Sequence, residues 1–320
     1  MLSYKPIALD EIINARDRIK DIIVRTPLVK LNFDNQDLEI YIKLENLQPV
    51  GSFKLRGAAN AMSLVSDSDI HKGVWTVSAG NMAQGLAWCA RERGIACTVI
   101  VPDQIPETKA ANINRLGAKY IKVPFEKFEE TFITRSYPGV NGHFIHPFSD
   151  PSVMAGNGTI GLEILEDLPD VQSLIISYAG GGLSCGIASA VKAINPSIKI
   201  YAAEVETGAP FAASLELGQP KVVNYTPSFV DGIGGSMVFN EMFDLAKELL
   251  DGSFVSSLEE IAFASKIIME RNRVIAEGAA AAAVAAAIAG KAGKGKTACI
   301  ISGGNIDSEK IKQILSGKTP

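Results

Sequence analysis

The chain has few of the residues that build disulfide-linked or metal-dependent proteins. Its 320 residues include four cysteines and three histidines. The cysteines form no C-x-x-C pair, and each lies in an apolar or glycine-rich stretch: Cys89, Cys97, Cys185 and Cys299. The histidines are not spaced like a pair of zinc ligands: His71, His143 and His146. We therefore expect reduced, packed thiols and no bound metal, and metal-dependent hydrolysis is poorly supported.

Long apolar runs and an excess of one charge are also missing. The formal net charge is -4, and charges of both signs are interspersed. The chain therefore lacks the clusters of basic residues that are typical of nucleic-acid-binding proteins. The first twenty residues have no apolar core of signal-peptide length, and the alanine-rich stretch at 277–290 is too weakly hydrophobic to favour lipid. We expect a cytoplasmic protein that binds small molecules, without nucleic acid or membrane as partners.

What is present predicts an α/β fold. With 47% hydrophobic residues, the chain can bury one large core or two smaller ones. Short β-branched runs alternate with amphipathic segments at 9–23, 82–93, 106–116, 152–167 and 258–273, which favours mostly parallel strands. The runs are EIYIKL (39–44), GVWTV (73–77), CTVIV (97–101), YIKV (120–123), SLIIS (173–177), IKIYAA (198–203) and TACIIS (297–302). No linker marks a domain boundary, so a second domain would be inserted within the first.

A lysine stands where a loop passes into a predicted helix, in ENLQPVGSFKLRGAANAM at 45–62. Most lysines lie on solvated helix faces, and this is the ordinary interpretation of Lys54. However, Lys54 follows Phe53 at the helix start, an apolar setting. A lysine amine that attacks a carbonyl must be partly desolvated so that its neutral form is accessible. Lys54 is therefore a candidate nucleophile.

A second motif, VSAGNMAQGLA at 77–87, follows a predicted strand and opens a helix. Backbone N–H groups at a helix N-terminus favour an anion, and Ser78 and Asn81 could add side-chain hydrogen bonds. The alternative is an ordinary N-cap, with Ser78 or Asn81 as the cap and Gly80 for backbone freedom. The motif alone does not separate a carboxylate site from a cap.

A third motif, SYAGGGLSCGIASA at 177–190, leads from a predicted strand through three glycines into a helix. Adjacent glycines with unhindered N–H groups make a phosphate cradle. A dinucleotide fingerprint is less well supported, because Cys185 stands where its third glycine should be. A tight turn without a ligand remains the structural alternative.

Two further features are ambiguous. In CIISGGNID at 299–307, Ser302 could donate to a buried ring nitrogen or cap a helix that begins near Asp307. His146, in HPFSDPSVMAGNGT, is more simply a packed imidazole at a strand end than a catalytic group. The sequence has no G-x-S-x-G elbow, so serine hydrolysis is also poorly supported.

Four ordered motifs, SFKLRG, SAGNMAQG, AGGGLSCG and SGGN, resemble the serine/threonine dehydratase and serine racemase family of fold type II pyridoxal 5'-phosphate (PLP) enzymes, over nearly the whole chain. The resemblance implies a tryptophan synthase β-like fold with two domains, each a mostly parallel sheet flanked by helices. We expect residues 1–70 and 148–320 to form the large PLP-binding domain, and residues 71–147 the small inserted domain. The cofactor would lie between them, and the resemblance implies a homodimer.

The same resemblance assigns roles by position. Lys54 would bind PLP covalently and act as the catalytic base, Phe53 would pack against the pyridine ring, and Ser302 would meet the ring nitrogen. Asn81 would hydrogen-bond the ring hydroxyl. The phosphate would be held by the backbone amides of Gly180, Gly181, Gly182 and Leu183. Gly232 and Glu277 would lie near the cofactor. The substrate carboxylate would bind at Ser78, Gly80 and Asn81.

The implied reaction is α,β-elimination from L-threonine or L-serine to a 2-oxo acid and ammonia. A racemase or β-replacement enzyme and a non-catalytic ligand-binding protein are the alternatives. Racemisation is disfavoured because Ala79 replaces the serine that supplies a second proton carrier in the racemase. Met82 stands where members commonly have histidine, so the substrate pocket is expected to differ.

Two further departures concern regulation and metal binding. Glu204 matches the first ligand of a cation site in some members, but Pro210 replaces a later acidic ligand, so no metal is expected. The chain ends at Pro320, soon after the last motif, and we expect no feedback control through an appended regulatory domain.

Overall fold

The computed structural model describes residues 4–35 and 37–320. Its strands are β1 (Leu28–Lys30), β2 (Leu38–Lys43), β3 (Val74–Val77), β4 (Cys97–Pro102), β5 (Lys119–Val123), β6 (His143–Phe144), β7 (Ser173–Ser177), β8 (Lys199–Val205), β9 (Gly252–Ser256) and β10 (Gly295–Ile300). Its helices are α1 (Leu9–Ile19), α2 (Lys54–Ser63), α3 (Asp67–Ile70), α4 (Asn81–Glu92), α5 (Glu107–Arg115), α6 (Phe125–Thr134), α7 (Pro151–Asp167), α8 (Gly182–Ile194), α9 (Pro210–Leu217), α10 (Asn240–Leu249), α11 (Leu258–Asn272), α12 (Gly278–Ile288) and α13 (Ser308–Leu315), with a 3-10 turn at Glu45–Leu47.

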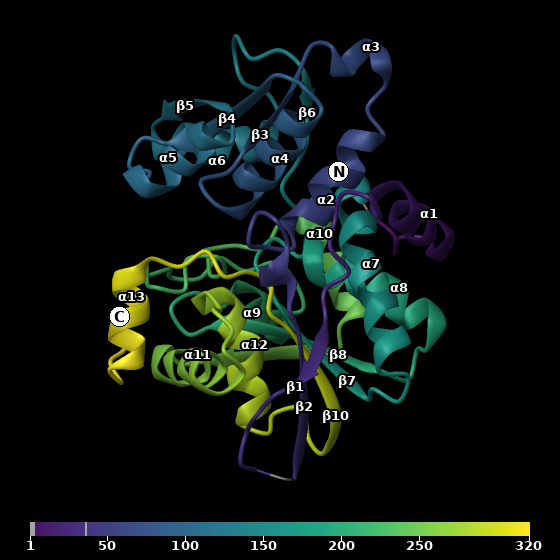
Figure 1. The fold of residues 1–320 in the computed structure, drawn as a ribbon, viewed down its shortest axis with the longest axis vertical. Coiled ribbons are helices and arrows are strands. Elements are labelled where there is room, and N and C mark those ends of the chain that lie inside the picture. The colour runs from purple at the N-terminus through teal and green to yellow at the C-terminus, as the bar shows by residue number, and fades with distance from the viewer. Residues whose placement is uncertain (1–3, 36) are drawn as a thin grey trace.

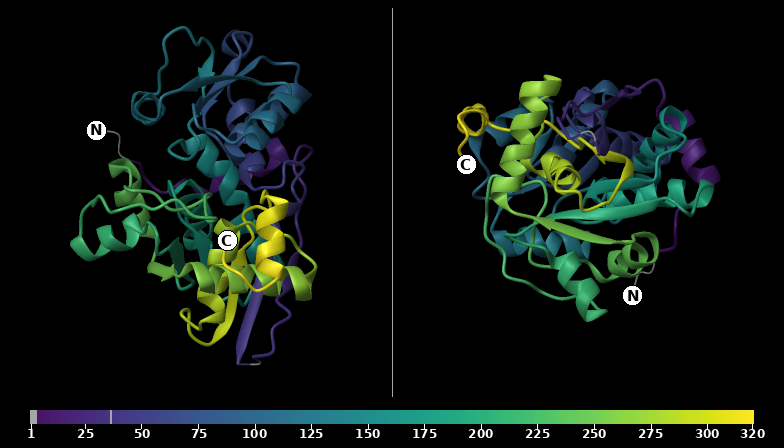
Figure 2. Two further views of the ribbon diagram at one scale, coloured as in Figure 1. Left: turned by 90° about the vertical axis from the view of Figure 1, so that its left-hand side faces the viewer. Right: turned by 90° about the horizontal axis from the view of Figure 1, so that it is seen from below.

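The strands form two separate sheets, one above the other in Figure 1. The six-stranded sheet has the order β1-β2-β10-β7-β8-β9, and the four-stranded sheet has the order β5-β4-β3-β6. Every strand pair is parallel except β1 with β2. This confirms the predicted α/β class with largely parallel strands, and Figure 2 shows the two sheets with their helices from two other sides.

The strands of the large sheet have apolar side chains on both faces, which explains why helices cover both faces of this sheet. Along β7, Ile175 belongs to the apolar cluster under α11 and α12, whereas Leu174 and Ile176 belong to the cluster with α8 and α10. Successive side chains of a strand point to opposite faces, so a strand apolar at every position must be buried on both. The predicted run SLIIS has three consecutive apolar residues, Leu174, Ile175 and Ile176, and each of its five residues is buried.

The alanine-rich stretch forms α12, whose residues Gly278 to Ala287 are all buried. This helix packs against β7, β8, β9, β10 and β2. Alanine combines high helix propensity with a small side chain, so the helix axis can approach the sheet closely. The alanine-rich stretch is thus a helix of the protein core.

The smaller sheet is covered in the same way. Val74 of β3 packs in the cluster with α4 and α2, and Trp75 packs with Phe128 and Phe132 of α6 on the other face. Helix α2 contacts both α4 and α7, so it packs against the helices of both sheets. The four-stranded sheet lies within residues 71–147, but the boundaries of the two domains stay a prediction.

Several local features of the structure follow from the sequence around them. Ser257 caps α11 in a reciprocal capping box with Glu260, and α5 begins at Glu107 directly after Pro106. All four cysteines are buried and free. Among residues 4–35 and 37–320, no helix is long and apolar enough to cross a bilayer.

Candidate active site

A cavity of about 310 Å³ opens where strands of both sheets end. Ser78 follows β3, Ser177 ends β7, and Ser302 follows β10, and all three line the cavity. Ligands of open α/β sheets bind outside the carboxyl ends of the strands. All twelve residues that the motifs predicted for the site line this one cavity: Phe53, Lys54, Ser78, Gly80, Asn81, Gly180, Gly181, Gly182, Leu183, Gly232, Glu277 and Ser302.

Lys54 is the first residue of α2, and its side chain lies against the cavity wall. Its Nζ donates a hydrogen bond of 2.6 Å to the carbonyl oxygen of Pro147 and lies 5.1 Å from the centre of the Phe53 ring. Burial lowers the pKa of Lys54 to about 8, although the charge of Glu277 acts in the opposite direction. A neutral amine, which can attack a carbonyl, is therefore accessible near neutral pH.

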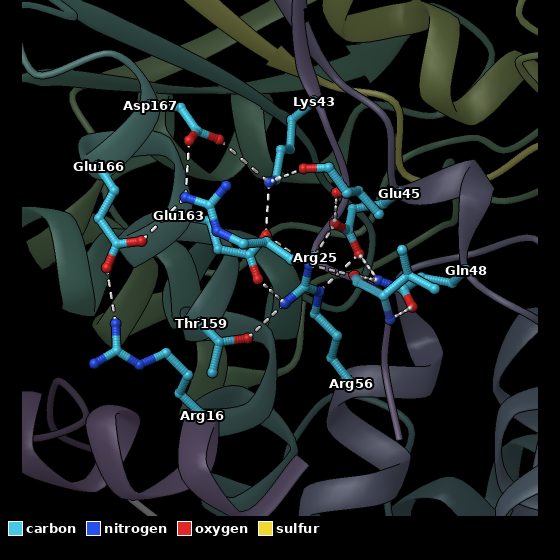
Figure 3. Close-up of polar contacts among 12 residues, drawn as sticks. Arg16, Arg25, Lys43, Glu45, Gln48, Arg56, Thr159, Glu163, Glu166 and Asp167 are labelled. Atoms are coloured by element: carbon cyan, nitrogen blue, oxygen red, sulfur yellow. Dashed lines mark hydrogen bonds and ion pairs between the residues drawn. The ribbon is translucent and has the colours of Figure 1, made fainter. Parts of the chain in front are cut away.

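Helix α2 is fixed by a group of buried charges around Arg56, two residues after Lys54, shown in Figure 3. Arg56 donates to both oxygens of Glu45 and to both oxygens of Glu163, and Lys43 donates to Glu163 at 2.6 Å. We call these four residues the buried charge cluster. Burial opposes the charge on Glu45, but Arg56 overcomes this and keeps the pKa of Glu45 below its usual value. Two cations and two carboxylates thus compensate one another in the interior.

The triple glycine forms a cradle that side chains would obstruct. Gly181 is the N-cap of α8 with φ of 83°, a left-handed conformation that glycine adopts without strain. A Cβ atom on Gly182 would lie 2.6 Å from the carbonyl oxygen of Phe148, and one on Gly180 would overlap the Phe148 ring. The first N–H groups of α8 have no partners within the helix, and no side chain caps them. A phosphate fits this arrangement.

Helix α4 also begins at the cavity. Its N-cap is Gly80, and no side chain makes a capping hydrogen bond. The alternative in which Ser78 or Asn81 caps the helix is therefore wrong: Ser78 Oγ accepts from Gly80 N at 3.2 Å, and Asn81 lies inside the helix. Free N–H groups at this helix end suit a carboxylate.

Asn81 connects the two sheets across the site. Its Nδ2 donates to Oε1 of Glu277 at 2.9 Å, and its Oδ1 accepts from Nδ2 of Asn305 at 2.7 Å. Burial, with the nearby charge of Asp231, raises the pKa of Glu277 to about 7. The site thus holds an amine and a carboxyl group that both titrate near neutrality, which is characteristic of functional sites.

Ser302 lies in a third wall of the active-site cavity. Its carbonyl oxygen accepts from Phe53 N at 2.9 Å, which joins the SGGN and SFKLRG motifs. Helix α13 begins at Ser308 with Asp307 as its N-cap, so the alternative in which Ser302 caps this helix is wrong. A serine hydroxyl at the cavity wall can donate to or accept from a ring nitrogen.

His146 is a packed imidazole, as expected. It is buried, its Nδ1 accepts from the backbone N of Phe148 and of Ser149, and its ring contacts four phenylalanine rings. Burial lowers its pKa to about 3, with further contributions from Arg135 and Lys54. The neutral imidazole thereby fixes the turn that presents Pro147 to Lys54.

Sequence reasoning missed several residues of the cavity wall. Phe128 and Phe132 come from α6, and Phe148 comes from the turn after His146. Lys109 and Asp231, joined by an ion pair of 2.7 Å, also line the cavity. Asp231 directly precedes Gly232, which the family resemblance placed near the cofactor, but nothing in the helical pattern of α6 marked its phenylalanines as site residues.

The structure shows what surrounds the positions that depart from the family pattern. Ala79 lines the cavity, and Met82 is buried where its side chain meets both the cavity and the core. Glu204 accepts hydrogen bonds from the backbone N of Phe211 and of Ala212, at the start of α9, and from Ser253 Oγ. In the part of the chain that the structure describes, no group of three or more His, Cys, Asp or Glu side chains is placed to hold a metal.

Fold and site together define an α/β enzyme that binds a phosphorylated aldehyde beside a lysine of lowered pKa. The residues fit such a group because the glycine cradle leaves room for a phosphate and the Lys54 amine faces the same cavity. Residues 19–303 match the family described as pyridoxal-phosphate dependent enzyme. The chain belongs to this family, and its cofactor is PLP.

Relatives of known structure or curated function agree with this assignment. The chain is 39% identical to L-threonine ammonia-lyase of Thermotoga maritima over 97% of its length and 78% of that protein. It is 38% identical to the catabolic L-threonine dehydratase TdcB of Escherichia coli over 97% of its length and 96% of the relative. The serine racemase structure from Dictyostelium discoideum matches with a TM-score of 0.86 at 33% identity, covering 94% of this chain and 99% of the other.

Proposed function

We propose that the protein is a PLP-dependent ammonia-lyase that eliminates the β-hydroxyl group of a β-hydroxy amino acid such as L-threonine or L-serine. One observation carries the proposal: the Lys54 amine, the glycine cradle and the free N-terminus of α4 all face one cavity. These are the groups needed to bind a phosphorylated aldehyde and an amino-acid carboxylate side by side. The names of the relatives, threonine ammonia-lyase and threonine dehydratase, support the same reaction.

Each wall of the cavity receives a role in this proposal. The N–H groups of the cradle, Gly180, Gly181, Gly182 and Leu183, hold the phosphate. Ser302 would meet the ring nitrogen, Phe53 would pack against the ring, and Asn81 would hydrogen-bond the ring hydroxyl. Gly232 and Glu277 would lie near the cofactor, and Ser78 and Gly80 would receive the substrate carboxylate together with Asn81.

The chemistry of the proposed reaction begins with a proton on the substrate. When bound, PLP supplies an aldehyde for the substrate amine and a conjugated ring that accepts electron density from the α-carbon. Lys54 Nζ takes the proton from Cα, and the hydroxyl group leaves Cβ as water. Hydrolysis of the remaining C–N bond then uses one water, so one 2-oxo acid and one ammonia result from each amino acid.

The alternatives have less support. A racemase needs a second proton carrier on the opposite face of the substrate, and Ala79 has no group that can carry a proton. A β-replacement enzyme needs a site for a second substrate, which the motifs did not provide. A non-catalytic binding protein would have no use for an amine whose pKa is lowered to about 8.

The experiment is to purify the protein with PLP and follow its absorption spectrum. The proposal expects a yellow protein in which borohydride fixes the cofactor to Lys54, as located by peptide mass spectrometry. Serine or threonine should then release equal amounts of 2-oxo acid and ammonia. The variant Lys54→Ala should lose this activity, whereas Lys72→Ala, at an exposed surface pair, should keep it. Formation of D-serine without a 2-oxo acid would favour the racemase, and a colourless protein would favour the binding protein.

We further propose that the protein is a cytoplasmic homodimer with a small domain at residues 71–147 inserted in a larger one. Its four free, buried cysteines suit a reducing compartment, and the family resemblance supports the dimer and the domain division. Sedimentation analysis of the purified protein tests the dimer, since a single species at the mass of one chain would contradict it.

A further inference from the structure

A second cavity, of about 240 Å³, shares a wall with the active site. The shared wall consists of Phe128, Phe132, Phe148, Ala179 and Gly180. The three phenylalanines are half-buried, so their rings form the surface of the cavities and are not sealed in the core. We call this second cavity the aromatic annex, and its larger apolar side chains include Phe125, Phe128, Phe132, Phe148, Met237 and Phe239.

The annex contains no charge that could compensate an acidic substituent. Of the described residues that line it, none is Lys, Arg or His. Its polar groups are the neutral side chains of Tyr178 and Ser236 and the exposed carboxylate of Glu129. Because an uncompensated charge is costly to bury, the annex is unsuited to the side chain of 3-hydroxyaspartate.

The size of the annex suits an aromatic ring. An apolar cavity of about 150 Å³ is sufficient to bind benzene. The methyl group of threonine or the hydrogen of serine would leave most of the annex unfilled. Its rings already pair edge to face, Phe128 with Phe132 at 5.0 Å and Phe148 with Phe239 at 4.9 Å between centroids. A substrate ring placed among them could make the same kind of contact.

A third cavity also adjoins the active site, and it is polar where the annex is apolar. The two cavities together restrict how a substrate can be oriented. A cavity of about 220 Å³ shares a polar wall with the active site, made of Gly80, Asn81, Lys109, Asp231, Gly232 and Glu277. The annex shares none of the residues 78–81. A substrate whose carboxylate binds at the N-terminus of α4 therefore has the polar cavity at that end and the annex at another.

From these observations we propose that the aromatic annex binds the β-substituent of the substrate, and that the preferred substrates are β-hydroxy amino acids with an aromatic or branched apolar group, such as 3-phenylserine. This inference rests on the proposed function. The Cα–H and Cβ–O bonds break as before, water leaves, and hydrolysis of the C–N bond gives an aryl 2-oxo acid and ammonia.

The first test compares kcat/KM for the threo and erythro forms of 3-phenylserine with those for L-threonine, L-serine and 3-hydroxyaspartate. We expect a 3-phenylserine form to exceed L-threonine by at least about tenfold, because even one methylene in an apolar pocket changes selectivity by about 10- to 200-fold. A value equal to or below that of threonine overturns the inference. If none of these amino acids yields a 2-oxo acid, the proposed function itself fails.

The second test reduces the volume of the annex by adding a side chain at a glycine in its wall. Gly235 lines the annex, its φ lies outside the left-handed region, and a Cβ there would meet nothing within 4 Å. The variant Gly235→Val should lower kcat/KM for 3-phenylserine at least about tenfold and leave that for threonine within about twofold. An equal loss for both substrates would show that the annex does not bind the substituent.

A matched pair of phenylalanines supplies the control. Phe125 lines the annex and is 58% exposed, whereas Phe263 lies on α11, outside the annex, and is 51% exposed. Phe125→Ala should weaken the selectivity for 3-phenylserine over threonine, and Phe263→Ala should leave the ratio unchanged. Unchanged selectivity in both variants would count against the inference.

Discussion

Arg56 and Glu163 are joined by two buried hydrogen bonds, of 2.6 and 2.9 Å, although 107 residues separate them in the chain. Arg56 belongs to α2, which begins with Lys54, and Glu163 belongs to α7. The pair therefore fixes the helix that begins with Lys54 to the helical layer of the large sheet. Its position is shown in Figure 3.

We expect Glu163→Gln to destabilise the fold strongly. The substitution keeps the size of the side chain but leaves Arg56 paired only with Glu45, and Lys43 with the more distant carboxylate of Asp167 at 4.0 Å. Breaking a buried ion pair costs about 3–5 kcal/mol in free energy of unfolding, because an uncompensated charge stays buried. Urea denaturation of the apoprotein measures this change.

Glu166, on the same helix, is the control. It pairs with Arg16 and Arg25 at the surface, where its side chain is 48% exposed. Glu166→Gln should cost only about 0–1 kcal/mol, because solvent screens exposed pairs. Similar losses for Glu163→Gln and Glu166→Gln would contradict the distinction between buried and exposed charges.

Capture of PLP by the apoenzyme should depend on pH through Lys54. The neutral amine attacks the aldehyde, and burial lowers the pKa of Lys54 from 10.5 to about 8. The association rate should therefore rise with pH and level off above about 8. Stopped-flow absorbance measures this rate, and Nα-acetyl-lysine in solution is the reference for an ordinary lysine. A midpoint near that of the reference would mean that Lys54 is not desolvated.

Removing the charge of Glu277 should move this midpoint downward. Glu277 raises the pKa of Lys54 by Coulomb attraction, and its own pKa of about 7 means that it is charged in the range where Lys54 titrates. In Glu277→Gln the protonated amine loses this stabilisation, so the midpoint should fall below about 8. The same stopped-flow series measures it, with Glu259→Gln, on the exposed start of α11, as control. An upward shift would contradict the assignment.

A side chain at Gly182 should weaken PLP binding. In Gly182→Ala the new Cβ would lie 2.6 Å from the carbonyl oxygen of Phe148, so the cradle must shift. We expect the Kd for PLP to rise by at least about tenfold, roughly 1.4 kcal/mol, since the N–H groups no longer converge on the phosphate. Fluorescence titration of the apoprotein measures Kd.

The control for this variant is Gly235→Ala, whose Cβ has open space around it. Gly235 lines the aromatic annex and not the cradle, so its substitution by alanine should leave the Kd for PLP unchanged. If Gly182→Ala binds PLP as tightly as Gly235→Ala, the cradle is not the phosphate site.

The elements predicted from sequence were those with strong local signals. All seven β-branched runs contain strands, because consecutive apolar residues such as Leu174, Ile175 and Ile176 can be buried only where both faces of a strand are covered. The strands that were missed are short or partly exposed. β6 has two residues and β9 is mostly half-buried, so neither has a continuous apolar run.

The alternation of strands and helices could be predicted from the amino-acid sequence, as could the glycine and serine motifs at the strand ends, because these depend on local propensity and backbone freedom. Which side chains meet could be seen only in the folded molecule. The pairing of Arg56 with Glu163, the low pKa of Lys54 and the annex beneath Phe128 and Phe148 arise from segments far apart in the chain. Burial, which sets the energy of charges and the shape of cavities, exists only once those segments pack together.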